Sequence, residues 1–370
     1  MMRIAAVTLR RATGAPIKTN TGNYMFTEAV YRNLDAQVEW VGFRFTPEAV
    51  NEKFDAVIVP AANWLNANSD FADLARRIEQ LTIPVTCVGL GTQAPSLDSL
   101  EVDISPSALD LARVLSHKNA SISLRGEFTR AVLARHGITN TVVTGCPSLY
   151  MDVAARSDDG ANGGIVLQGT RYVMARPVLR RKLLDNDIFR IAGRGNYDIV
   201  YQSEKLEIAY LDGTGREGWE QAAHDSGLPQ LYGFDSAPAM RDYLELRGRV
   251  FTNIDSWSDY LKTKTAVVGS RLHGAILALN SGVPALLLPH DSRTRELIDF
   301  AGIPTADPDT VLDVRNARVT LPGNLAEMVR AYRDRRARNK RIYQDFLAAN
   351  GLAFRDSRPE HDRAGLLAVS

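Results

Sequence analysis

The chain has 370 residues, 45% hydrophobic and 24% charged, a composition that excludes disorder and coiled coil and is long for one hydrophobic core. Its 44 Lys and Arg residues are balanced by 43 Asp and Glu residues, so no overall basic field points to a nucleic-acid partner. Neither cysteine, Cys87 or Cys146, has a C-x-x-C neighbour or a metal-ligand spacing.

Short apolar runs alternate with helical patterns along residues 1–155, which is typical of parallel βαβ units. The runs are almost continuously apolar, and this favours a sheet covered by helices on both faces. We predict strands at 3–9, 56–59, 85–90, 121–124 and 142–144. Between them we predict helices at 24–33, 71–81, 105–116 and 128–136.

A polar, glycine-rich segment at 156–164 has no periodicity, and we interpret it as a linker. The alternation resumes over 165–325, a closing helix is predicted at 326–350, and a loosely ordered polar tail at 351–370. The fold class predicted is therefore α/β, with two Rossmann-like doubly wound domains, 1–155 and 165–325, facing a cleft. Ligands of such sheets bind at the carboxyl ends of the strands.

The stretch 265–288 is the most informative, because it predicts a strand, a tight turn, a helix and a second strand. Gly269 permits the turn, and Ser270 is predicted to cap the helix. Arg271 and His273 then fall in the first helical turn, where free N–H groups and the helix dipole favour an anion. There an Arg can bind a phosphate bidentately and a His can transfer a proton. A surface ion pair and a helix cap explain the spacing equally well.

This stretch contains Ser-Arg-Leu-His-Gly at 270–274 and Ser-Gly-Val-Pro at 281–284. Five further segments precede it in order: Asn-Thr-Gly-Asn at 20–23, Val-Gly-Leu-Gly-Thr-Gln at 88–93, Ser-Leu-Arg-Gly-Glu-Phe-Thr at 123–129, Val-Thr-Gly-Cys-Pro-Ser at 143–148 and Asp-Ile-Val-Tyr-Gln-Ser-Glu at 198–204. Together, these segments resemble the polysaccharide pyruvyl transferase family. Each segment is weak alone, and their order and spacing over about residues 3–305 carry the resemblance.

The resemblance implies a fold like that of two-domain GT-B-type glycosyltransferases. It implies an enzyme that transfers pyruvate from phosphoenolpyruvate to two hydroxyls of a sugar, forming a ketal and releasing phosphate. Arg271 and His273 match the family's donor-binding Arg and its acid/base His. We therefore expect phosphoenolpyruvate as co-substrate, no other cofactor, no metal, and a saccharide acceptor that is free or lipid-linked.

Other polar residues follow predicted strands or lie in the first β/α turn, facing the predicted cleft. Arg125 and Arg171 are candidate cations, although Arg125 could equally bond the segment that follows it. The further candidates for substrate binding are Asn20, Asn23, Gln93, Ser270 and His290. Many family members have Gly-Asp where this chain has Gly-Asn at 22–23, so any base role of that acid is open here.

Two other functions remain open from the sequence. A nucleotide-sugar glycosyltransferase on the same architecture needs a ribose-binding acid late in the second domain, and Glu296 is the only candidate. The second open function is that of a non-catalytic, carbohydrate-binding relative, because Asn23 replaces the usual acid.

The first apolar run is too short for a signal peptide, and no stretch approaches the roughly 20 apolar residues of a membrane span. We expect a cytoplasmic protein, free or in peripheral contact with the inner face of the membrane.

Overall fold

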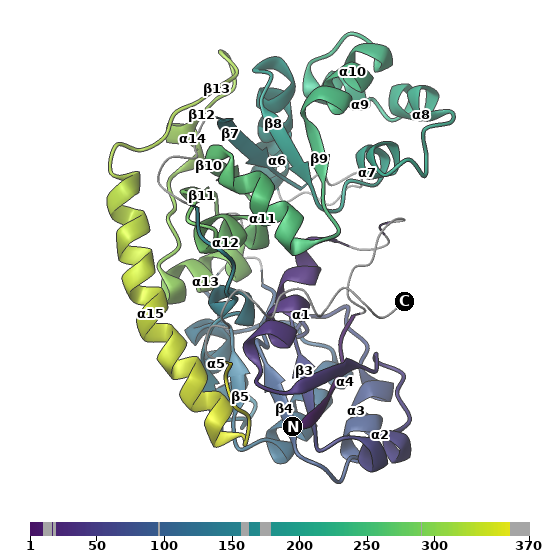
Figure 1. The fold of residues 1–370 in the computed structure, drawn as a ribbon, viewed down its shortest axis with the longest axis vertical. Helices are drawn as coiled ribbons and strands as arrows, with labels where there is room; N and C mark the ends of the chain where they lie inside the picture. The colour runs from purple at the N-terminus through teal and green to yellow at the C-terminus, as the bar shows by residue number, and fades with distance from the viewer. Residues whose placement is uncertain are drawn as a thin grey trace.

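The computed structural model describes residues 1–9, 17, 20–94, 97–156, 163–170, 179–289 and 291–355. Its body consists of two parallel sheets, which lie one above the other in Figure 1. We call the part from β1 to η1 the N-terminal half and the part from β7 to α14 the C-terminal half. A long helix, α15 (Leu325–Ala349), runs along the outside of both halves (Figure 1).

The N-terminal sheet has the order β2-β1-β3-β4, with all its pairs parallel. A parallel bridge between Leu90 and Leu124 joins it to the pair β5-β6. The elements are β1 (Arg3–Ala6), α1 (Gly22–Asn33), β2 (Gln37–Trp40), α2 (Pro47–Lys53), β3 (Ala56–Pro60), α3 (Ala72–Glu79), β4 (Val85–Val88), α4 (Pro106–Lys118), β5 (Ile122–Leu124), α5 (Glu127–Arg135), β6 (Thr141–Val143) and the 3₁₀ helix η1 (Pro147–Tyr150).

The C-terminal sheet has the order β11-β10-β7-β8-β9 and is also parallel throughout. Its elements are β7 (Gly163–Gln168), α6 (Leu179–Arg194), β8 (Asp198–Tyr201), α7 (Lys205–Leu211), α8 (Trp219–Asp225), α9 (Leu228–Tyr232), α10 (Ala237–Arg247), β9 (Gly248–Val250), α11 (Ile254–Lys262), β10 (Lys264–Gly269), α12 (Leu272–Asn280), β11 (Ala285–Leu287), α13 (Ser292–Ala301) and α14 (Pro308–Val311), followed by the hairpin β12 (Leu312–Asp313) and β13 (Arg318–Val319).

The predicted fold class, two doubly wound α/β units, is confirmed by these sheets. The sequence patterns missed β2, which is an edge strand whose residues are exposed or half-buried and therefore not continuously apolar. The domain limits stay a prediction. Of the predicted linker, 157–162 lies outside the described residues, and β7 already begins at Gly163.

The two faces of the N-terminal sheet belong to different cores. Ala5, Val57 and Val59 pack in a core whose buried residues all belong to the N-terminal half, including residues of α3 and α4. Ile4 and Ile58 point to the other face and belong to a core that continues into the C-terminal half. This alternation follows from the two-residue period of a strand. One apolar core therefore connects the two halves.

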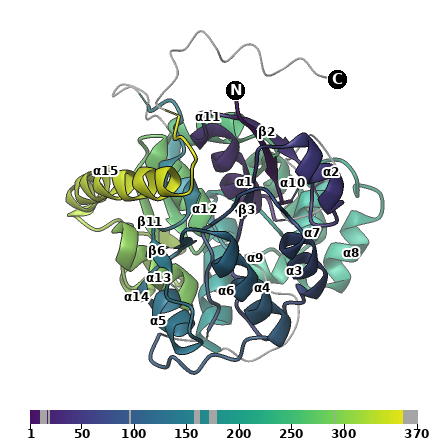
Figure 2. The same cartoon turned by 90° about the horizontal axis from the view of Figure 1, so that it is seen from below.

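The end of the chain returns to the N-terminal half. Tyr343 of α15 stacks on Tyr150 with ring centroids 4.9 Å apart, and Phe354 forms an antiparallel bridge with Leu34. The first residues of the predicted loose tail are therefore docked, and residues 356–370 lie outside the described part of the chain. Figure 2, seen from below, shows α15 standing at the outer edge of the molecule.

Helix α13 of the C-terminal half is anchored on the N-terminal half. Ser292 Oγ donates to the carbonyl of Ala94 at 2.7 Å and accepts from its N–H at 3.0 Å. Glu296 accepts hydrogen bonds from Thr129 N (2.6 Å) and Thr129 Oγ1 (3.0 Å). A Cβ atom at Gly126 would overlap the Glu296 side chain, so only glycine leaves room for this contact. Burial raises the pKa of the Glu296 carboxyl to about 7, against the lowering by Thr129.

We predict that Glu296 makes the free energy of unfolding fall as the pH rises. A carboxyl whose pKa is raised in the folded state keeps a proton that the unfolded chain has released, so this stability is present below about pH 4.5 and is lost as the pH rises through about 7. Glu296→Gln resembles the protonated form at every pH, so it should lose this pH-dependent part of the unfolding free energy. In the wild-type protein that part is on the order of 2 kcal/mol between about pH 5 and 8. Urea unfolding of both proteins at the two pH values measures it.

The matched control is Glu79→Gln, which removes an exposed carboxyl of α3. It should keep the pH dependence of the wild-type protein. The assignment is wrong if wild type and Glu296→Gln change in stability equally between the two pH values.

Candidate functional site

Arg271, between β10 and α12, is held by the protein along one edge of its guanidinium group. Its Nε donates to the carbonyl of Gly169 at 2.8 Å, and its Nη2 donates to Ser203 Oγ and to Glu204 Oε1, the latter at 2.5 Å. A guanidinium has five N–H donors, so among the described residues these three bonds leave the two N–H groups of Nη1 for a ligand. We predicted that the guanidinium of Arg271 would bind a phosphate bidentately. In the structure one edge of the group binds the protein instead, and one nitrogen is left for an anion.

The partner of Arg271 is the carboxylate of Glu204, whose side chain is 0% exposed. Its Oε2 accepts from the N–H groups of Gln202 (2.9 Å) and Ser203 (3.0 Å), and its Oε1 accepts from Ser203 Oγ (3.1 Å) and Arg271. A buried carboxylate is tolerated when it is paired and hydrogen-bonded in this way. Glu204 therefore fixes both the arginine and the loop after β8.

A chain of amides continues from Arg271 toward the N-terminal half. Gln168 donates from Nε2 to the carbonyl of Arg271 at 3.2 Å, and Gln202 Nε2 donates to Gln168 Oε1 at 3.2 Å. A Cβ atom at Gly274 would overlap Gln168 Oε1, and one at Gly269 would overlap the backbone carbonyl of Gln168. Gly269 of the predicted turn and Gly274 of α12 therefore both serve the close approach of β7 to the start of α12.

The first turn of α1 lies against this chain. Thr21 N donates to the carbonyl of Gln202 at 2.8 Å, which joins the two halves through their backbones. Asn20 Oδ1 accepts from the N–H of Gly22 at 2.9 Å. A Cβ atom at Gly22 would lie 2.5 Å from Gln202 Oε1 and 3.3 Å from His273 Nδ1. The N-termini of α1 and α12 therefore meet at the interface between the halves.

His273 is half-buried at this meeting point. Its ring lies 5.9 Å from that of Phe26 on α1, and its Nε2 is 3.8 Å from Cys146 Sγ. Cys146 and Cys87 are both buried free thiols, as their apolar sequence contexts indicate. The C-terminal His273 is thus positioned partly by residues of the N-terminal half.

Arg125 follows β5 and is 3% exposed. Its Nε donates to the carbonyl of Gly89 at 3.0 Å and its Nη1 to Asn63 Oδ1 at 2.7 Å. Gly89 in turn adjoins Pro147, the residue after Cys146, since a Cβ atom at Gly89 would lie 3.0 Å from Pro147 Cδ. Arg125 and His273 thus lie near the same junction, and neither lies on an outer surface.

The other predicted residues are spread more widely. Ser270 is buried and donates its N–H to the carbonyl of Gln168, but the N-cap of α12 is Arg271, whose side chain makes no capping bond. Asn23 is half-buried in the first turn of α1, and Gln93 is exposed after β4. Arg171 and His290 lie outside the described residues.

Glu204 appeared in the sequence analysis only as the last residue of the segment 198–204, and its hold on Arg271 was missed. The available signal was an acid directly after β8, at the carboxyl edge where functional residues of such sheets gather. Glu296, the acid required by the nucleotide-sugar alternative, is 4% exposed and bonded to Thr129. Its carboxylate is therefore committed to anchoring α13.

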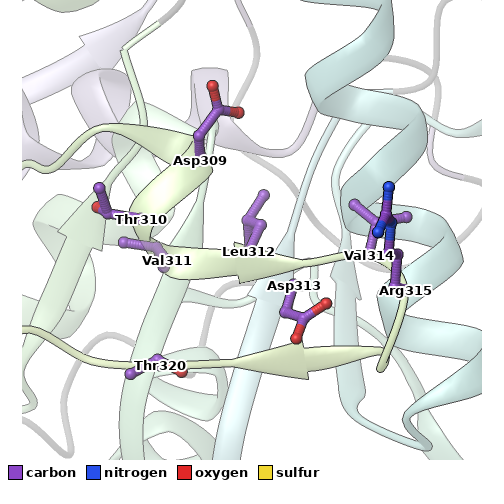
Figure 3. Close-up of a pocket in the computed structure, with 8 residues that line it drawn as sticks. All are labelled: Asp309, Thr310, Val311, Leu312, Asp313, Val314, Arg315 and Thr320. Atoms are coloured by element: carbon purple, nitrogen blue, oxygen red, sulfur yellow. The ribbon is translucent and has the colours of Figure 1, made fainter.

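A hollow of about 390 Å³ lies elsewhere, at the β12–β13 hairpin (Figure 3). It contains none of the predicted site residues and is lined by Asp309, Thr310, Val311, Leu312, Asp313, Val314, Arg315 and Thr320.

Among the residues that the structure describes, no group of three or more His, Cys, Asp or Glu side chains could hold a metal ion. None of the described helices is both long and apolar enough to cross a membrane.

The sequence profile of the polysaccharide pyruvyl transferases matches residues 20–292, which span the Asn20 turn, both halves and the Arg271–His273 turn. The chain belongs to the polysaccharide pyruvyl transferase family. Family membership makes this protein a transferase that acts on polysaccharide. No curated protein sequence matches it significantly.

Several solved structures are similar to the chain at low sequence identity. The UDP-GlcNAc 2-epimerase of Methanocaldococcus jannaschii, in complex with UDP-GlcNAc and UDP, is 11% identical, with a TM-score of 0.46 over 90% of this chain and 99% of that one. The UDP-GlcNAc 2-epimerase of Neisseria meningitidis, bound to UDP-GlcNAc, is 11% identical, with a TM-score of 0.46 over 94% and 100%. The glycosyltransferase SnogD of Streptomyces nogalater is 14% identical, with a TM-score of 0.40 over 94% and 99%.

We predict that Arg271 and Glu204 are energetically coupled. Glu204→Gln leaves a buried guanidinium without its counter-charge and should cost about 3–5 kcal/mol of unfolding free energy. Arg271→Gln added to this variant should cost less than it does in the wild-type protein, with a coupling energy of about 1–3 kcal/mol. A double-mutant cycle by urea unfolding measures this quantity.

The control cycle replaces Glu204→Gln by Glu207→Gln. Glu207 is equally buried on α7, and its carboxylate accepts from Tyr232 at 3.0 Å. Its cost should add to that of Arg271→Gln within about 0.5 kcal/mol. Equal coupling in the two cycles would contradict a specific pair between Arg271 and Glu204.

Proposed function

We propose that the protein transfers the pyruvyl group of phosphoenolpyruvate to a sugar of a polysaccharide or glycolipid precursor. One sugar hydroxyl adds to the enol carbon of the donor while its methylene carbon takes a proton. A second hydroxyl then displaces phosphate, which closes the cyclic ketal and breaks the bond to the phosphate oxygen. Phosphoenolpyruvate is the co-substrate in this scheme, and no other cofactor takes part.

The observation that carries this proposal is the convergence of positive groups where α1 and α12 meet. Gly22, at the start of α1, and His273, in the first turn of α12, are neighbours, and each helix N-terminus presents partial positive charge. The Nη1 group of Arg271 adds two N–H donors beside them. A small, multiply charged anion such as phosphoenolpyruvate suits this arrangement, because such groups stabilise both the donor and the phosphate charge that develops on transfer.

His273 is the residue we assign to proton transfer. It is half-buried beside the first turn of α1, and imidazole exchanges protons near neutral pH. Arg125, Asn20 and Asn23 belong to the N-terminal half, and we assign the acceptor sugar to that side. Asn23 cannot act as a base, which leaves His273 as the group that handles protons. We further propose that the reaction takes place in the cytoplasm, on an acceptor that is free or carried by a lipid.

We predict that phosphoenolpyruvate raises the thermal stability of the protein. A ligand that binds only the folded state stabilises it by about 2.7 kcal/mol at one hundred times its dissociation constant. Thermal unfolding with phosphoenolpyruvate and with UDP-sugars separates the two donor classes, and phosphate release with candidate glycans then tests turnover. A shift with UDP-sugars alone would overturn the pyruvyl donor in favour of glycosyl transfer.

We predict that Arg271 and His273 affect different steps. Arg271→Lys keeps the charge but cannot reproduce the planar contacts to Gly169 and Glu204, so it should weaken donor binding, and Arg271→Ala should weaken it further. His273→Ala should reduce turnover by about 10²–10⁴ with a smaller effect on donor affinity. Calorimetry of donor binding and phosphate release measure the two quantities.

His273→Gln is the matched variant, because it retains a polar side chain and cannot carry the proton. It should turn over as slowly as His273→Ala. Normal turnover by His273→Ala would mean that His273 has a packing role beside α1 and no role in proton transfer.

A further inference from the structure

Helix α15 presents a basic face to solvent. Between residues 330 and 341 the helix exposes five arginines and one acid, Asp334, which leaves four positive charges in excess on a chain whose net charge is only +1. The arginines are Arg330, Arg333, Arg335, Arg338 and Arg341. Together they form what we call the α15 basic face.

Among the described residues, the charges of this face have no acidic partners. Some exposed arginines of the N-terminal half have acidic partners: Arg76 is paired with Asp73 at 3.0 Å and Arg113 with Asp110 at 2.8 Å. In the described part of the chain, none of the five arginines of the α15 basic face makes an ion pair within 4.0 Å or a side-chain hydrogen bond. Their positive potential is therefore directed at the solvent.

The position of the face suits an extended anionic surface. The opposite side of α15 is buried in the shared core through Tyr332, Tyr343 and Phe346, so the helix cannot turn or insert its apolar side into another phase. Figures 1 and 2 show α15 at the outer edge of the molecule, alongside both halves. Ile342 is 39% exposed, follows Arg341 directly and comes four residues, or about one helical turn, after Arg338. It therefore adds an apolar side chain next to the charges.

We infer that the α15 basic face docks the protein on the surface of a membrane containing anionic phospholipids. Clusters of four to eight basic side chains on a helix bind such surfaces through the phosphate charges, and each basic residue contributes roughly fivefold to the partition coefficient. The face exposes no aromatic side chain on which nucleic-acid bases could stack. The inference does not depend on the proposed reaction, but docking of this kind would bring the enzyme to a lipid-linked acceptor.

The test is co-sedimentation of the full chain with vesicles of phosphatidylglycerol and phosphatidylcholine, compared with vesicles of phosphatidylcholine alone. The wild-type protein should bind only the anionic vesicles, and about 1 M salt should release it, because the Debye length then falls to about 3 Å. The combined substitutions Arg330→Gln, Arg338→Gln and Arg341→Gln should reduce binding at least tenfold, since about fivefold is expected per charge.

The matched control removes the same charge from the N-terminal half by Arg76→Gln, Arg113→Gln and Arg130→Gln, at three exposed positions of α3, α4 and α5. This variant should bind within about twofold of wild type, and thermal unfolding establishes that both variants fold.

Equal losses in both variants, undiminished binding of the α15 variant, or no binding by wild type would overturn the inference. Tighter binding to a random DNA duplex than to the anionic vesicles, with the same salt dependence, would assign the face to nucleic acid. None of these outcomes requires turnover, so they are independent of the test of the proposed reaction.

Discussion

The buried carboxylate of Glu204 is the contact on which the proposed site depends. It accepts hydrogen bonds from two backbone N–H groups, one hydroxyl and the guanidinium of Arg271. Only an ionised acid has acceptors for all of these donors and the charge to balance the arginine. The same bonds hold Gln202, whose backbone carbonyl receives Thr21 from the other half. One side chain thus sets the position of the cation and the docking of α1 beside His273.

Much of this arrangement could be predicted from the sequence because its signals are local. The turn from β10 to α12, with Gly269 and the Arg271–His273 pair, follows from apolar runs and from a glycine at the sharp turn. The start of α13 is equally local, because Asp291 forms a capping box with Thr294 three residues later. These features depend on residues three or four positions apart, and such spacing can be seen in the sequence itself.

What the sequence could not predict are contacts between distant segments. Glu204 and Arg271 are far apart in the chain, and no periodicity relates them. The orientation of the Arg271 fork toward the protein follows from that contact, so an open fork was expected instead. Glu296 illustrates the same limit: it was considered as a ribose-binding acid, whereas its partner Thr129 belongs to the other half. A buried acid and its partner are recognised as a pair only after the fold brings them together.

The apolar core that joins the two halves limits how this enzyme can admit its substrates. Rotating the halves apart would expose apolar side chains of this shared core to water, at about 25 cal/mol for each Å², against a net stability of about 5–15 kcal/mol for an ordinary domain. Local rearrangement of loops is therefore a less costly way to admit substrates than a wide hinge motion. The same continuity couples the stability of the two sheets, because they share packing in one core. Damage to packing in one half will lower the melting temperature of the other.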